Sequence, residues 1–200
     1  MSTQNKCSEH SNNKYSVKTI SELHQHSITS SVNKKNNLIE IVIYSLQKAS
    51  LSDYMPTLEN FRFSIDSEYS YEENIDNLKV FARKYIMLDI DVSMFDKSKK
   101  NLKAVLDATL QGDMLNTELN TLSITANLNP KQISLLGAIL TYEVQLLAEH
   151  SQTSIRNTLI KYPNISSHFI EYFFTKFEPK IKNRSKGISE VTEKITDSIK

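Results

Sequence analysis

The pattern of apolar and polar residues changes once along the chain, near Asp96. Upstream of it, apolar residues form short β-branched or alternating runs, and downstream they recur every three or four residues. The runs at 38–44, 61–66 and 78–90 each predict a strand, because β-branched residues and a period of two suit a pleated, half-buried surface. A helix cannot keep a period-two pattern buried, so the sequence predicts an α+β protein in which a small sheet is followed by a helical array.

One helix is expected between the first two strands. Ser52 and Asp53 are typical N-cap residues, and the apolar residues after them share one face at spacings of three and four: Tyr54, Met55, Leu58 and Phe61. Strand, helix, strand and strand in this order make up most of a ferredoxin-like sheet. Residues 37–94 are therefore expected to form a small, incomplete ferredoxin-like sheet with one helix.

The N-terminal residues 1–36 are rich in Ser, Asn, Lys and His and show little periodicity, so a weakly ordered polar tail is expected there. A weak apolar spacing between 17 and 23 is the one sign of a short helix. His24 and His26 lie two positions apart and face different sides of any helix, which argues against a metal site.

Residues 95–179 are predicted to be helical. Asp96 is a typical N-cap, and Gly112 stands where a helix is expected to stop. The buried face of this first helix is expected to consist of Leu102, Val105, Leu106 and Leu110. Another helix is expected to begin at Asn129–Pro130, because proline is favoured at the first helical position, and to bury Ile133, Leu136, Leu140, Val144 and Leu147.

Two more amphipathic helices are expected on either side of Pro163, which supplies no backbone donor and ends the first of them. The first has an apolar face of Ile155, Leu159 and Tyr162. Asn164 is expected to cap the second, whose apolar residues recur every four positions as far as Pro179: Ile165, Phe169, Phe173 and Phe177. Both faces are predicted to be buried against neighbouring helices. Residues 180–200 are expected to form a polar linker helix.

Composition excludes several classes of function. The chain has 24 basic and 23 acidic residues, so no bulk charge draws it to nucleic acid or to anionic lipid. Cys7 is the single cysteine, which rules out a disulfide framework and fits a reducing cytoplasm. The sequence has no apolar run typical of a signal peptide or a membrane span. With three glycines, neither the G-x-G-x-x-G nor the G-x-x-x-x-G-K-[ST] phosphate loop can be written, so no nucleotide cofactor is expected.

Catalytic residues are not predicted either. The only local cluster that resembles a triad is Glu149, His150 and Ser151, and adjacent residues on a helix point in different directions. His168 is expected to be a half-buried or exposed helix residue. No catalytic, cofactor-binding or metal-binding residue is therefore assigned.

Four motifs, in the same order along the chain, resemble those of the large bacterial NAD-specific glutamate dehydrogenases. They are L-S-D-x-x-P-x-L-E-N at 51–60, G-x-x-x-N-x-x-L-N-x-L at 112–122, L-x-A-x-x-x-Y-x-x-Q at 136–145, and S-Q-x-x-I-x-x-x-L-x-x-Y-P at 151–163, the last followed by F-x-x-x-F-E-P at 173–179. The chain departs from the family pattern at five positions: Arg62 replaces a glycine, Leu115 and Thr117 replace acids, and Gly137 and Val144 replace arginines. Charged and polar positions are lost, whereas apolar packing positions are kept.

The resemblance covers residues 38–200 and implies the last of several ACT-like regulatory folds, followed by the helical segment upstream of the catalytic domain. The family oxidises glutamate to 2-oxoglutarate with NAD, but no part of this chain resembles its catalytic lysine region or its dinucleotide-binding fold. The resemblance therefore implies a non-catalytic regulatory and helical fragment from a split or decayed gene, whose partners are other segments of such an enzyme or copies of itself. The alternative is a freestanding ACT-like module that binds a small metabolite or a protein, and neighbouring reading frames discriminate between the two.

Isolated from such partners, the chain is expected to expose apolar surface and to associate. An open sheet edge is expected near Leu38–Tyr44, and three aromatic side chains have too few neighbours on a short chain: Phe173, Phe174 and Phe177.

Overall fold

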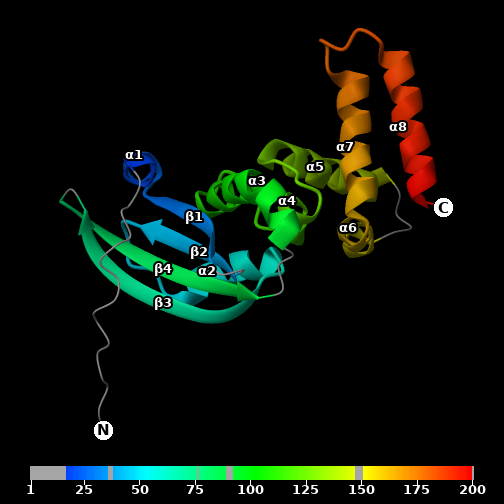
Figure 1. Ribbon diagram of the computed structural model, residues 1–200. Coiled ribbons are helices and arrows are strands. Elements are labelled where there is room, and N and C mark those ends of the chain that lie inside the picture. The colour runs from blue at the N-terminus through cyan, green and yellow to red at the C-terminus, as the bar shows by residue number, and fades with distance from the viewer. Residues whose placement is uncertain (1–16, 36–37, 76, 89–91, 147–150, 200) are drawn as a thin grey trace.

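The computed structural model describes residues 17–35, 38–75, 77–88, 92–146 and 151–199. The elements are α1 (Val17–His26), β1 (Ile28–Lys35), β2 (Leu38–Ser45), α2 (Leu51–Asn60), β3 (Ser64–Ile75), β4 (Leu78–Leu88), α3 (Val92–Leu110), η1 (Glu118–Thr121), α4 (Leu122–Thr125), α5 (Pro130–Leu146), α6 (Gln152–Lys161), α7 (Pro163–Phe177) and α8 (Arg184–Ile199). A curved sheet occupies one end of the molecule, and the paired helices α7 and α8 occupy the other (Figure 1). The predicted α+β class, with a small sheet followed by helices, is confirmed.

The sheet has four strands in the order β1-β2-β4-β3, and every neighbouring pair is antiparallel. The predicted strands at 38–44 and 78–90 are the two central strands, β2 and β4. The strand predicted at 61–66 begins later, at Ser64, because Phe61 still caps α2, and it runs on to Ile75. Strand, helix, strand and strand follow one another as expected.

The expected polar tail is wrong for residues 28–35, which form β1, whereas α1 lies where the weak apolar spacing between 17 and 23 indicated a short helix. Strand β1 pairs with β2 along its whole length, from Ile28 opposite Ser45 to Lys35 opposite Leu38. The sheet is therefore not incomplete on this side, and the predicted open edge near Leu38–Tyr44 is covered. Residues 1–16, with Cys7, lie outside the described residues.

The two faces of the sheet are buried by different helices. Alternate β2 residues Ile39, Ile41 and Ile43 belong to one large core with the apolar faces of α2 and α3. The residues between them, Val42 and Tyr44, belong to a smaller cluster with Leu23 of α1. The large core continues without a break into the helical part, where it includes Leu119, Leu122, Ile133, Leu136 and Ile160.

The helical part differs from its prediction at two helix starts. Helix α3 begins at Val92, so Asp96 lies inside it and is not its N-cap. Helix α7 begins at Pro163 itself, with Tyr162 as the cap residue, so Asn164 is not its N-cap. Helix α5 begins at Pro130 as predicted, and the side chains of Asn129 and Gln132 accept hydrogen bonds from each other's backbone N–H at 3.1 and 2.9 Å. No helix in the described part of the chain has the length and apolar character of a membrane span.

Helices α2 and α3 end in the same backbone motif. After α2, Arg62 N–H donates to Glu59 O at 2.8 Å and Phe63 N–H donates to Leu58 O at 3.4 Å, which is the Schellman pattern. After α3, Gly112 and Asp113 make the equivalent bonds to Thr109 O and Ala108 O. The motif requires a positive φ at its turning residue, and φ is +59° at Arg62 and +80° at Gly112. The position where the family pattern has glycine therefore needs the conformation that glycine adopts most easily.

A buried polar cluster fastens β1 to α3. Asp107 Oδ1 accepts hydrogen bonds from Ser30 N–H and Ser30 Oγ, both at 2.7 Å, and Asp107 also pairs with Lys103. Lys103 Nζ lies 3.0 Å from Glu22 Oε2 on α1. Burial alone would lower the pKa of Lys103, but the hydrogen bonds and charges of Asp107 and Glu22 outweigh it and raise that pKa above its ordinary value of 10.5.

We predict that Arg62→Gly stabilises the protein by about 1 kcal/mol, because glycine relieves the left-handed strain at the end of α2. Gly112→Ala is the matched control and should destabilise by about 1 kcal/mol, because open space surrounds a Cβ at this position and only the φ of +80° opposes it. Urea unfolding of the three proteins measures both changes. A loss of stability in Arg62→Gly would contradict the strain at this turn.

We predict that Asp107→Ala destabilises the protein by about 1 to 3 kcal/mol, because it leaves the N–H and the hydroxyl of Ser30 without their acceptor and leaves Lys103 with Glu22 as its remaining ion-pair partner. Glu190→Ala breaks an exposed pair with Lys186 on α8 and should change stability by less than about 0.5 kcal/mol. The raised pKa of Lys103 means that its contribution is complete below pH 10.5 and is lost as the pH rises above it, so the cost of Asp107→Ala should shrink there. Denaturant unfolding at pH 7 and pH 11 tests both statements.

Candidate functional site

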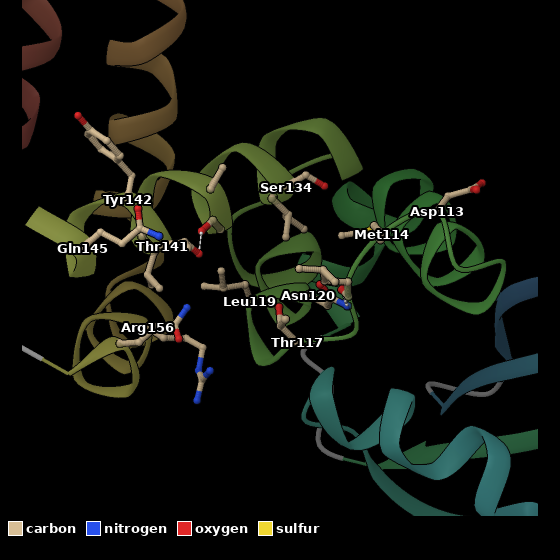
Figure 2. Close-up of a pocket in the computed structure, with 16 residues that line it drawn as sticks. Asp113, Met114, Thr117, Leu119, Asn120, Ser134, Thr141, Tyr142, Gln145 and Arg156 are labelled. Atoms are coloured by element: carbon tan, nitrogen blue, oxygen red, sulfur yellow. Dashed lines mark hydrogen bonds between the residues drawn. The ribbon is translucent and has the colours of Figure 1, made fainter.

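A pocket of about 550 Å³ opens between the loop after α3, η1, α5 and α6 (Figure 2). Its apolar lining consists of Met114, Leu115, Leu119, Ile133, Gly137, Ala138 and Leu140. Its polar lining consists of Asp113, Thr117, Asn120, Ser134, Thr141, Tyr142, Gln145, Gln152 and Arg156. The volume lies in the range of small-molecule sites.

Three of the four motifs converge on this pocket. Leu119 and Asn120 come from the motif at 112–122, Ala138, Tyr142 and Gln145 come from the motif at 136–145, and Gln152 opens the motif at 151–163. Residues separated by some thirty positions in the sequence are thus brought together by the packing of η1, α5 and α6. The pocket is the place where the sequence motifs meet in space.

Asn120 is the most deeply placed polar residue of the pocket, with 0% of its surface exposed. Its Nδ2 donates to Thr109 Oγ1 at 3.2 Å and to Leu115 O at 3.3 Å. The Thr109 hydroxyl donates its own proton to Val105 O at 2.7 Å, so both neighbours of Nδ2 are acceptors and the orientation of the amide is fixed. Asn120 Oδ1 is left without a hydrogen-bond partner among the described residues.

Asn116, from the same motif, ties the helical part to the sheet part. Its Nδ2 donates to Thr57 Oγ1 at 3.2 Å, and its Oδ1 accepts from Asn60 Nδ2 at 3.0 Å. Asn60 ends the motif at 51–60, so residues of two separate motifs bond directly to each other. The Asn60 side chain thus bonds to another side chain and not to a backbone group at the end of α2.

Three of the five departures from the family pattern also lie on the pocket. Leu115 and Thr117 stand where the pattern has acids, Gly137 stands where it has an arginine, and all three line the same space. A Cβ on Gly137 would meet only Leu119 Cδ1, at 3.8 Å, which leaves room for a side chain. The charged residues of the lining are Asp113 and Arg156, and Arg156 Nε lies 3.3 Å from Glu118 Oε2.

The arrangement is that of a binding cavity with an apolar floor. Thr141 donates its hydroxyl proton to Gly137 O at 2.9 Å, so this side chain serves α5 itself. The features that distinguish the cavity are the unpaired Asn120 Oδ1 and the Arg156–Glu118 pair. In the sequence, Asn120 stood out only as one position of a motif. Arg156 was not predicted, because the local sequence around an arginine on an amphipathic helix does not show which element its side chain will face.

The other residues considered from the sequence lie apart from the pocket. His24 and His26 are exposed in the last turn of α1, and the described residues contain no group of three or more potential metal ligands. His168 is partly buried on α7, as expected, with Nδ1 3.4 Å from Ser198 Oγ. Ser151 caps α6 by accepting from Ser154 N–H at 3.2 Å. Glu149 and His150 lie outside the described residues.

The predicted burial of the α6 and α7 stripes is wrong in part. Tyr162 is 45% exposed and Phe169 is 46% exposed. The buried residues are instead Ile160 on α6 and Ser166 and Ile170 on α7. Most residues of the predicted stripes line a second, apolar hollow between α5, α6 and α7.

We predict that Gly137→Ala stabilises the protein by about 0.5 to 1 kcal/mol, because alanine is the better helix former and the new methyl group enters open space beside Leu119. Gly187→Ala on α8 is the matched control. There a Cβ would lie 2.8 Å from Thr175 Cγ2 on α7, so the helix-forming gain should be offset or reversed. Thermal unfolding compares the two variants, and equal gains would contradict the difference in space between the two sites.

Comparisons with known proteins agree with the motifs. Residues 114–179 match the family model described as glutamate dehydrogenase, helical motif 3. The chain is 25% identical over 152 residues to the NAD-specific glutamate dehydrogenase of Halomonas elongata and 26% identical over 156 residues to that of Pseudomonas aeruginosa. These matches cover 72% and 75% of this chain, and the chain spans about 9% of the length of either relative. Together they support the assignment of this chain to the family of the NAD-specific glutamate dehydrogenases.

Proposed function

We propose that this chain is a non-catalytic segment of a NAD-specific glutamate dehydrogenase, with a packing and regulatory role. The observation that carries the proposal is the use of the shared polar motif residues. Asn60, Asn116 and Asn120 direct their amide groups to other side chains or backbone atoms of this chain. Residues that serve a reaction present their polar atoms to a substrate, whereas Asn60 and Asn116 join the sheet part to the helical part and Asn120 Nδ2 bonds to Thr109 and Leu115.

The sequence supports the same proposal. Oxidation of glutamate by NAD requires the nicotinamide to be held against the substrate, and neither glycine-rich phosphate loop can be written in this chain. The matched family model is described as a helical motif. The origin of the chain in a split or decayed gene stays a prediction, and it is tested by whether neighbouring reading frames encode the remaining segments in order.

A freestanding ACT-like module remains the second candidate, and the sheet favours it. Strand β1 covers the β2 edge from within the chain, and α1, α2 and α3 bury both faces of the sheet. A unit that closes its own sheet can fold without a partner on that edge. The pocket of about 550 Å³ supplies the space that a small metabolite requires.

We predict that the purified chain alone shows no glutamate-dependent formation of NADH. Absorbance at the NADH band is followed with glutamate and NAD, with a complete NAD-specific glutamate dehydrogenase as the positive control. A chain carrying Asn120→Ala is assayed in parallel, because the proposal assigns this residue to folding. NADH formation that co-purifies with the chain, in either protein, would overturn the proposal.

A further inference from the structure

Helices α5, α6 and α7 enclose an open apolar groove of about 480 Å³. Each helix contributes one wall. The α5 wall consists of Leu136, Ile139, Leu140 and Glu143, and the α7 wall consists of Ile165, Phe169, Tyr172 and Phe173. The third wall consists of Ile155, Thr158 and Leu159 of α6 and of Tyr162, the residue that follows this helix. The three helices meet where the α7–α8 pair joins the rest of the molecule (Figure 1). The groove is separate from the pocket around Asn120, although Leu140 lines both.

The walls of the groove are the apolar stripes of amphipathic helices. Such a stripe normally faces the core of the protein. Here the stripes of α6 and α7 face each other across the groove, and Phe169, Tyr162 and Ile139 remain 46%, 45% and 36% exposed. Covering these two aromatic rings and one isoleucine removes apolar surface from water, which favours an occupant that supplies an apolar face.

The charges at the rim of the groove indicate what charge an occupant should carry. Lys161 Nζ lies 5.2 Å from the centroid of the Tyr162 ring, and Lys176 Nζ lies 5.6 Å from that of the Tyr172 ring. Both rings line the groove, and neither lysine forms an ion pair with another described residue. The one acid of the lining, Glu143, stands on the α5 wall. The α6–α7 side of the groove is therefore positive.

We propose that this groove binds an amphipathic helix of a partner polypeptide, with acidic residues along the flank that faces Lys161 and Lys176. The apolar face of that helix packs on Phe169, Tyr162 and Ile139, as in other helix-in-groove complexes. This partner rests on the proposed packing role, in which the remaining segments of a glutamate dehydrogenase supply the helix. The acidic flank makes the recognition directional, because lysines held over ring faces repel a basic helix.

The test uses the full chain and two synthetic peptides of equal length, each labelled with fluorescein. Both carry leucines at helical spacing, one with glutamates and the other with lysines on the flank of the apolar face. Fluorescence anisotropy should show that the acidic peptide binds at least tenfold more tightly, and that sodium chloride weakens its binding. The double variant Lys161→Glu, Lys176→Glu should reverse the preference between the two peptides.

Substitutions in the walls identify the groove as the binding surface. Phe169→Ser and Ile139→Ser should each weaken the acidic peptide about tenfold, because each removes an apolar contact at the groove. Ile199→Ser removes a side chain that is 69% exposed on α8, away from the groove, and should leave binding unchanged. Circular dichroism and thermal unfolding confirm that each variant folds, and two wall variants keep the test valid if one of them does not.

The outcomes separate the alternatives. Equal binding of both peptides, or binding of neither, overturns the proposal. Sedimentation that shows a dimer of the chain, dissolved by Phe169→Ser, also overturns it, because the occupant is then a second copy. A chain without dehydrogenase activity that fails to bind the acidic peptide leaves the proposed non-catalytic role standing and overturns this inference alone.

Discussion

The burial of α3 from two sides is the constraint on which the rest of the structure depends. Leu102, Val105 and Leu106 are fully buried in the one core that runs from the sheet into the helical part. The same helix contacts β1, α2, α4 and α5. Because α3 has no solvated apolar face, the sheet and the helical segment cannot be separated without exposing it, and each fully buried leucine of this kind is worth about 1.5 to 3 kcal/mol.

Polar bonds make this shared packing specific. The Ser30–Asp107 contact spans 77 positions of the sequence, and the Thr57–Asn116 contact spans 59. Apolar burial has no direction, whereas a hydrogen bond in a partly buried place costs free energy if its partner is missing. The first contact therefore fixes β1 on α3, and the second fixes α2 against the loop before η1.

The sequence predicted those elements whose residues carry their own signal. Strands β2 and β4 are β-branched and apolar, and α5 opens with a proline after a capping asparagine. Strand β1 was missed because Thr29 and Ser30, although fully buried, are polar. Their hydroxyl groups are satisfied by Glu22 and Asp107, so a tertiary contact rather than a propensity makes this strand.

The same reasoning explains what was found and what was missed at the pocket and the groove. The motifs identified residues around the pocket but not their convergence, because η1, α5 and α6 are brought together by tertiary packing that a local pattern does not show. The replacement of a pattern glycine by Arg62 could be interpreted from the sequence, because a glycine just after a helix commonly marks a position that needs a positive φ. The exposure of Phe169 could not be anticipated, because a periodic stripe shows that a face is apolar and does not show what covers it.

The covered β2 edge and the open groove together indicate which surface of this chain can bind another polypeptide. Sheet edges attract other chains through unpaired backbone groups, and β1 removes that opportunity at β2 while carrying Lys34 and Lys35 near its own end. The outer strand β3 is long, but Glu68, Glu72 and Glu73 place negative charge along it. Such charges oppose the addition of another strand. The charges on the outer strands therefore disfavour association through the sheet. The groove instead combines exposed aromatic rings with unpaired lysines. Contacts with other polypeptides should therefore form through the helices.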